Sequence, residues 1–203
     1  WAISIHTVTA FLYSGLGARS FWMTAILAPR FLASAFSSGP ALLILLCLIL
    51  RKFTKFDAGR EPIQKLAVIV TYAMAINVFF VVMEIFTALY SGIPEHVSHF
   101  QYLFLGLEGK ARLVPWMWTS AALALSSLVL LIIPRTRRRH TTLGIACVSL
   151  FLAIWIEKGL GMVVTGFVPN PLGMVTEYWP TFPEVMITLG VYAIGMLIVT
   201  LLY

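Results

Sequence analysis

Long apolar segments separated by short polar ones dominate this chain. Apolar runs close to 20 residues recur along it, and this is the length of α-helix that crosses a lipid bilayer. The alternating polarity of a transmembrane β-strand, over about ten residues, is not seen in the sequence. The pattern therefore predicts an all-α, polytopic transmembrane helical bundle of about six spans, the first incomplete. The expected spans are 1–13, 31–50, 66–90, 113–133, 141–164 and 184–203.

The composition agrees with a membrane protein. Of 203 residues, 60% are hydrophobic and 11% charged, and the mean hydropathy is +0.94. Soluble domains carry about 25% charged residues, so a soluble globular protein is excluded. Because the chain begins at Trp1 and ends inside an apolar run, we expect it to be a piece of a longer polypeptide.

The net charge of +6 comes from two short loops and gives no reason to expect a nucleic-acid partner. If every span crosses once, the basic loops 51–65 and 134–139 lie on the same side, which is then cytoplasmic by the positive-inside rule. The other connections, 14–30, 91–112 and 165–183, are longer and nearly balanced in charge. We expect them to form an extracytoplasmic surface on which a partner docks.

Ionisable residues inside the expected spans are the main functional clue. Glu84 lies within span 66–90, and Glu157 and Lys158 lie within span 141–164. Such groups are costly at membrane depth and usually face a protein interior or a water-filled cavity. From the helical rise, Glu84, Glu157 and His6 lie about 9, 10 and 12 Å from the outer ends of their helices. They therefore predict one polar layer in the outer half of the membrane.

Each member of this layer has a structural alternative. Asn77, Glu84 and Ser91 are seven residues apart and share one helix face, which suits proton transfer, binding of a polar ligand head or a helix–helix hydrogen bond. Glu157 and Lys158 are adjacent, so on an α-helix they diverge by about 100° and are not expected to face the same partner. Either they are structural, with Lys158 snorkelling, or one pairs across the bundle with Glu84 or Arg112.

His6 is the one histidine inside an expected span. Haem ligation by two histidines would need a second at similar depth, so a haem within this chain is not expected. Beside Thr7 and Thr9, His6 suits a hydrogen bond to a quinone carbonyl, or else a packing role. Cys47 and Cys147 have no metal-ligand spacing, so neither an iron–sulfur cluster nor any other metal site is predicted.

Several segments, in order and spacing, resemble the NrfD/PsrC family of membrane subunits that react with quinones, and most closely its DsrP branch from the DsrMKJOP complexes of sulfite and sulfate reducers. No single segment is diagnostic. The segments are SIHTVT (4–9), LAPRFLASAF (27–36), GLEGKARLVPWMW (106–118), WIEKGLG (155–161) and GFVPNPLG (166–173).

The resemblance implies a protein of eight to ten transmembrane helices in two bundles, in a prokaryotic cytoplasmic membrane. Residues 1–30 would supply the last helix of the first bundle and an extracytoplasmic loop, and 31–203 the second bundle. It also implies a menaquinol or other quinone site near the extracytoplasmic side. The implied partners are a ferredoxin-like iron–sulfur subunit and a multihaem cytochrome.

The sequence thus predicts a quinone-reacting subunit of an oxidoreductase complex, linked to the reduction of sulfite or other sulfur compounds. Glu84, Glu157 and Lys158 are the candidate proton-handling residues, and His6, Asn77 and Arg112 the candidate quinone-binding residues. Two alternatives stay open. A secondary transporter would show interrupted helices in two corresponding halves. A purely structural anchor for redox subunits would not need the charge of Glu84.

Overall fold

The computed structural model describes residues 1–177 and 180–202, and these residues form helices joined by loops, with no named strand among them. The elements are α1 (Ala2–Ser14), η1 (Ser20–Trp22), α2 (Leu27–Phe53), α3 (Arg60–Ser91), α4 (Pro94–Phe104), α5 (Val114–Ile132), α6 (Pro134–Arg137), α7 (His140–Trp155), η2 (Ile156–Met162), α8 (Val163–Phe167) and α9 (Phe182–Leu202).

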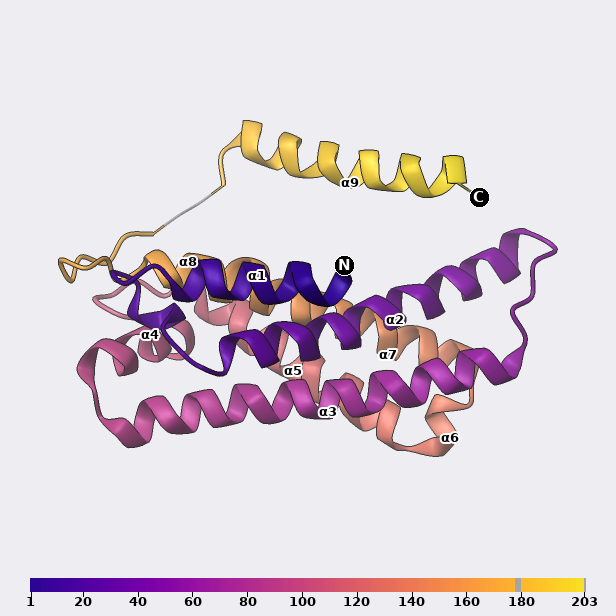
Figure 1. Cartoon of the computed structure of the whole chain (residues 1–203), viewed down its shortest axis with the longest axis horizontal. Helices are drawn as coiled ribbons and strands as arrows, with labels where there is room; N and C mark the ends of the chain where they lie inside the picture. The colour runs from indigo at the N-terminus through magenta and orange to yellow at the C-terminus, as the bar shows by residue number, and fades with distance from the viewer. Residues whose placement is uncertain (178–179, 203) are drawn as a thin grey trace.

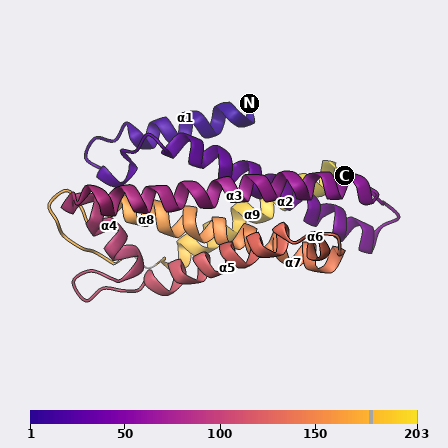
Figure 2. The same cartoon turned by 90° about the horizontal axis from the view of Figure 1, so that it is seen from below.

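The long helices α2, α3, α5 and α7 lie side by side in one elongated bundle, with α1 along the first half of α2 (Figures 1 and 2). In the described part of the chain, five helical segments are long and apolar enough to cross a membrane: α2, α3, α5, the continuous run α7–η2–α8, and α9. The prediction of an all-α, multi-pass membrane protein is confirmed. The incomplete first span corresponds to α1, which has 13 residues.

One predicted boundary was wrong in a way that matters. The expected span 31–50 begins earlier, at Leu27, so Arg30 lies in the first turn of α2 and not in the preceding loop. Arg30 is only 6% exposed. A cation at this position therefore lies inside the bundle, where the sequence analysis had placed only Glu84, Glu157, Lys158 and His6.

Two hydrophobic cores hold the bundle together. One joins α2, α3, α5 and α7 around Ile44, Met74 and Leu150. Small residues such as Ala41, Ala67 and Ala146 in this core let the helix backbones approach closely, as in other membrane bundles. The second core surrounds the fully buried Trp22 and joins the loops to α4, η2 and α8.

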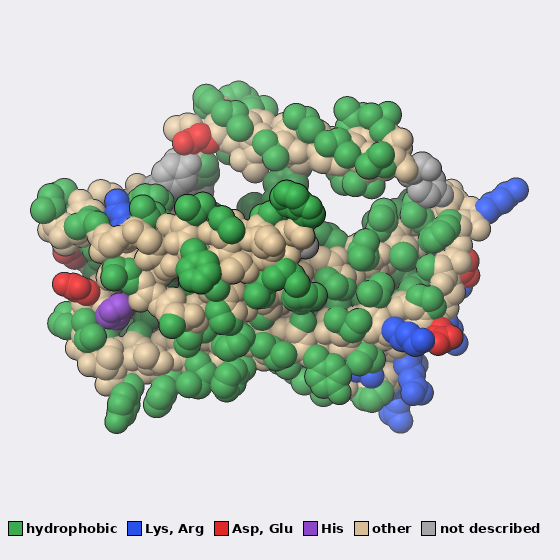
Figure 3. All heavy atoms as spheres, in the orientation of Figure 1, with side chains coloured by type: hydrophobic (Ala, Val, Ile, Leu, Met, Phe, Trp, Pro, Cys, Tyr) green, Lys and Arg blue, Asp and Glu red, His purple; other side chains and the backbone are tan. Residues whose placement is uncertain are grey.

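The two ends of the bundle differ in character. Apolar side chains cover the middle of the molecule, and most lysine and arginine side chains in this view gather at one end (Figure 3). We call the end formed by the α2–α3 loop and α6 the basic end. The opposite end, formed by 15–26, α4 and 165–175, is called the loop end. The last helix, α9, stands apart from the bundle, and none of its described residues is buried (Figure 1).

A buried charge cluster as candidate functional site

Arg30, Glu84 and Glu157 come together from three different helices inside the bundle. Arg30 lies 23 residues before the end of α2 at Phe53, and Glu84 lies 24 residues after the start of α3 at Arg60. Because α2 and α3 form an antiparallel pair joined by a short loop, these nearly equal lengths bring the two residues to the same level. Glu157 reaches this level from η2, which continues α7.

Arg30 is the centre of the contacts. Its Nη1 donates a hydrogen bond to Glu84 Oε2, and its Nη2 donates to Glu157 Oε1 at 2.6 Å. Lys158 Nζ lies 3.4 Å from the same Glu157 oxygen and 5.0 Å from the centre of the Phe31 ring. We call Arg30, Glu84, Glu157 and Lys158 the charge cluster.

The charge cluster is buried and balanced. The side chains are 7% exposed for Arg30, 9% for Glu84, 12% for Glu157 and 16% for Lys158. Two cations face two carboxylates, so the formal charge is zero when all four are ionised. A buried charge without a partner is strongly destabilising, whereas a balanced group with good hydrogen bonds is tolerated. The planar fork of arginine suits this position because it serves two carboxylates at once.

A local change of helix type explains how two adjacent residues join the same cluster. The expectation that Glu157 and Lys158 diverge too far to face a common partner was wrong, because both lie in the π-helical segment η2. A π-helix bonds residue i to i+5, so its turns hold more residues and successive side chains diverge less. π-Helical turns inside α-helices are frequent at functional sites.

Trp22 braces this segment from the loop end. Its indole Nε1 donates to the carbonyl of Met162 at 2.9 Å, at the last residue of η2. One turn later, Gly166 lies directly against the Trp22 ring: a Cβ built on Gly166 would lie 2.0 Å from two ring carbons. Only glycine fits there, and the contact fixes the end of the helix that carries Glu157 and Lys158.

The other candidate residues lie outside these contacts. Asn77 is on α3, seven residues before Glu84, and is 1% exposed. Its Oδ1 is buried and has no hydrogen-bond partner among the described groups. Arg112 is in the loop before α5 and pairs with Glu177 at 3.0 Å, so it does not serve as the cation of the charge cluster. That role belongs to Arg30, which the sequence analysis missed.

His6 stands half-buried on α1, outside the three helices that supply the charge cluster. His6, Ala10 and Ser14 are four residues apart and share one face of α1. A mainly apolar cavity of about 460 Å³ opens against this face, lined by Ala10 and Ser14 from α1 and by Leu27 and Pro29 from the start of α2. We call it the α1 cavity; it begins one helical turn from His6.

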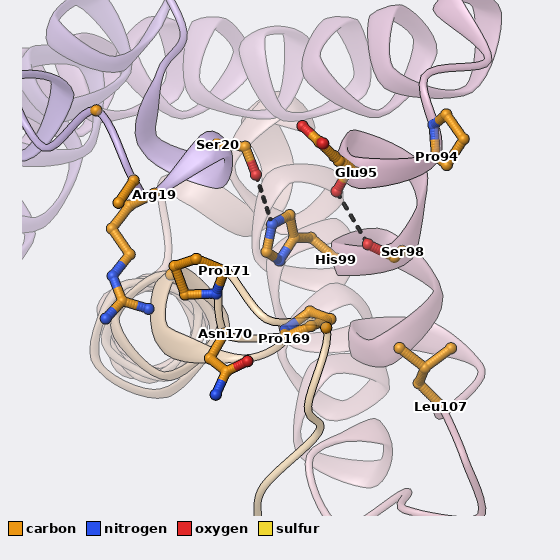
Figure 4. Close-up of a pocket in the computed structure, with 14 residues that line it drawn as sticks. Arg19, Ser20, Pro94, Glu95, Ser98, His99, Leu107, Pro169, Asn170 and Pro171 are labelled. Atoms are coloured by element: carbon orange, nitrogen blue, oxygen red, sulfur yellow. Dashed lines mark hydrogen bonds between the residues drawn. The ribbon is translucent and has the colours of Figure 1, made fainter.

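A second cavity, of about 550 Å³, lies among the loops of the loop end (Figure 4). At its wall, His99 and Ser20 point toward one another, with Nε2 3.0 Å from the serine Oγ. His99 Nδ1 is 3.2 Å from the carbonyl oxygen of Val168, which can only accept, so Nδ1 donates and Nε2 accepts from the serine hydroxyl. Burial lowers the pKa of His99 below its usual 6.5, which keeps the ring neutral near pH 7.

Comparison with known proteins agrees with the resemblance seen in the sequence. Residues 1–168 match the family described as "Polysulphide reductase, NrfD". The chain belongs to the NrfD family. The matched region of this NrfD chain holds the whole charge cluster and the α1 cavity, and it ends before α9.

A curated relative from Halobacterium salinarum carries the name "Putative dimethyl sulfoxide reductase membrane subunit". It is 27% identical to the NrfD chain over 222 residues, which cover 98% of the chain and 49% of the relative. The chain therefore spans about half the length of this relative.

Proposed function

We propose that this NrfD chain is part of the membrane subunit of a reductase complex, where electrons pass between a quinol or quinone and a redox partner. The charge cluster is the observation that carries the proposal: four ionisable groups from three helices meet inside an otherwise apolar bundle. Ionisable groups held within a membrane commonly mark proton relays. Family membership supports the quinone as the redox substrate.

Quinol oxidation explains why proton-handling residues are needed. It releases two electrons and two protons, and the electrons leave toward a metal centre of another subunit. The protons need acceptors within hydrogen-bond reach of one another or of bridging waters. In this chain, Glu84 and Glu157 are bridged by Arg30, and Glu157 is paired with Lys158.

The balanced charge suggests how such a relay operates. A proton arriving on Glu84 leaves the charge cluster with one excess positive charge, which is unfavourable in a low-dielectric interior. Loss of a proton from Lys158 restores neutrality. We therefore propose that uptake at Glu84 is coupled to release at Lys158, with Arg30 and Glu157 holding the two ends in electrostatic contact. The π-helical segment η2 positions Glu157 and Lys158 for this role.

The α1 cavity is the proposed quinone-binding region. Its apolar lining suits a quinone ring or the start of its hydrocarbon tail, and His6 on the same face of α1 supplies a hydrogen-bonding group. The buried Oδ1 of Asn77 is an acceptor with no protein partner in the described structure, which suits a bound water or a ligand hydroxyl. Arg112, exposed in its loop, is proposed to face the redox partner and not the quinone ring.

The finer assignment extends the same proposal. We propose that the basic end faces the cytoplasm of a prokaryote and that the loop end receives a ferredoxin-like iron–sulfur subunit, with a multihaem cytochrome as a further partner. Menaquinol as the quinol, reduction of sulfite or another sulfur compound, and a DsrP-type complex follow from the sequence resemblance. So does the division into residues 1–30 and 31–203 as parts of two bundles.

Quinol-dependent electron transfer in the intact membrane complex tests the proposal. The key variant is Glu84→Gln, and Glu61→Gln is its matched control because Glu61 lies on the same helix but is exposed at the basic end. General acid–base residues typically contribute about 10²–10⁴-fold, so Glu84→Gln is expected to slow turnover at least about 100-fold. The control is expected to keep the wild-type rate.

Equal rates for Glu84→Gln and wild type, at equal abundance in the membrane, would favour the structural-anchor alternative. Solute transport by the purified protein in vesicles without any quinol would favour the transporter alternative. His6→Ala, measured in the same assay, is expected to raise the KM for quinol more than it lowers kcat, because its proposed role is binding.

A further inference from the structure

A groove runs along the outside of the bundle between α2 and α7, close to the basic end, with a volume of about 490 Å³. Its walls include Leu45, Ile49, Ile145 and Val148. Ile49, Ile145 and Val148 are 53%, 56% and 45% exposed, so the groove opens to the surroundings of the bundle. Gly144 forms part of the floor, where the missing side chain leaves the hollow free.

Cationic groups stand at the mouth of this groove. Lys52 lines it, and its Nζ lies 5.6 Å from the centre of the Phe53 ring. Arg51 Nη1 donates to His140 Nε2 at 3.0 Å, which holds the guanidinium beside the groove. Arg51 is also 3.6 Å from Asp57, whereas Lys52 has no carboxylate within ion-pair distance among the described residues.

The start of α7 adds a further positive element. His140 and Thr141, the first residues of that helix, both line the groove, and no side chain caps the helix N-terminus. The first backbone N–H groups of a helix have no intrahelical acceptor and carry the positive end of the helix dipole. The mouth therefore combines an uncompensated lysine with free backbone donors, while the walls below are apolar.

We propose that this groove binds an anionic phospholipid, with one acyl chain along α2 and α7 and the phosphate at Lys52 and the first turn of α7. The arrangement matches both halves of such a lipid. Leu45 lies seven residues from Lys52, about 10 Å along the helix, which is the distance an acyl chain covers as it leaves its head group toward the bilayer centre. Basic pockets between transmembrane helices are known to favour anionic head groups.

Lipid binding to the purified full complex in neutral detergent tests this proposal, with retained lipid measured by native mass spectrometry. Dioleoylphosphatidylglycerol is the probe, and dioleoylphosphatidylcholine, with the same chains and a zwitterionic head, is the comparison. We expect selective retention of phosphatidylglycerol. Inorganic phosphate is expected not to compete, because it lacks the acyl chain that the groove holds.

Two pairs of variants locate the site. Lys52→Gln is expected to weaken phosphatidylglycerol binding roughly fivefold, as removal of one interfacial lysine does, while Lys55→Gln in the same loop leaves it unchanged. Val148→Phe fills the groove from an exposed position and is expected to abolish selective retention. Its control, Val129→Phe, places the same bulk on an exposed position of α5 outside the groove.

Three results would overturn the proposal. Equal retention of phosphatidylcholine would remove the role of the cations. Equal losses for Lys52→Gln and Lys55→Gln would show a diffuse attraction and no defined site. Full competition by inorganic phosphate would show a simple anion site that has no need of the apolar walls.

Discussion

The charge cluster makes a quantitative prediction about stability. Glu84→Gln keeps the shape of the side chain but leaves the cluster with a formal charge of +1. Arg30→Gln leaves it with −1. The double variant Arg30→Gln/Glu84→Gln restores a charge of zero, because Glu157 and Lys158 remain paired at 3.4 Å. Each single variant therefore creates a buried imbalance that the second substitution removes.

The size of the effect follows from the geometry. Two unit charges about 4 Å apart interact by about 4 kcal/mol at an effective dielectric constant of about 20. Removing one partner of a buried pair costs about 3–5 kcal/mol in practice. We expect each single variant to lower the free energy of unfolding by about that amount. The double variant should lose less than the sum, with a coupling energy of about 2–3 kcal/mol.

Unfolding in mixed detergent micelles by titration with dodecyl sulfate, followed by circular dichroism, measures these free energies. The control cycle is Glu61→Gln/Lys65→Gln on α3, an exposed pair at 2.7 Å with side chains 78% and 73% exposed. Such exposed pairs on a helix couple by about 0.3–0.5 kcal/mol. A coupling between Arg30 and Glu84 no larger than that of the control pair would refute the reasoning, because the two charges would then not be interacting in a low-dielectric interior.

Other predictions concern the loop end. Gly166→Ala is expected to lower the free energy of unfolding by about 1–3 kcal/mol or more, since the new Cβ would overlap the Trp22 ring; thermal unfolding of the purified protein measures it. His99 has a folded-state pKa below its unfolded value, so the unfolded state binds more protons as the pH falls through about 6.5. Stability should thus fall from about pH 7.5 to about pH 5.5, and His99→Gln should reduce that dependence. Arg112→Gln breaks a largely exposed pair with Glu177 and is expected to change the free energy of unfolding by less than about 1 kcal/mol, measured in the same way.

The spans could be predicted from sequence because they depend on a single strong signal, the length of each apolar run. The predicted depth of Glu84 and Glu157 was also useful: the structure brings both carboxylates to one arginine. What the sequence lacked was direction around the helix axis, which decides whether residues at one depth meet. Asn77 shares a face of α3 with Glu84, yet it lies two turns away from these contacts.

Arg30 escaped prediction because a cation at the edge of an apolar run is typical of the membrane interface. The apolar run was taken to begin at the next residue, whereas α2 begins three residues before it, at Leu27. A signal was nevertheless present. Two carboxylates inside the membrane require compensating cations, and Lys158 alone balances only one of them. Counting charges within the spans would have pointed to the nearest arginine at a helix end.

The π-helical segment η2 could not be predicted from the periodicity of the sequence. Its residues, Ile156–Met162, include Gly159 and Gly161, which lower the preference for a regular α-helix. The segment is fixed by tertiary contacts: the Trp22 hydrogen bond to Met162 and the close approach of Gly161 to Met117. Such contacts are formed by residues far apart in the chain, so the local sequence does not encode them.

The charge cluster can serve stability and chemistry together, and one variant separates the two roles. Arg30→Gln/Glu84→Gln is balanced in charge, so it is expected to fold and assemble more fully than either single variant. The decisive measurement is its rate of quinol-dependent electron transfer in the intact complex, at the same membrane abundance as wild type. The account predicts a folded protein with turnover reduced at least about 100-fold, because the proton acceptor is gone. A folded double variant that turns over at the wild-type rate would contradict it.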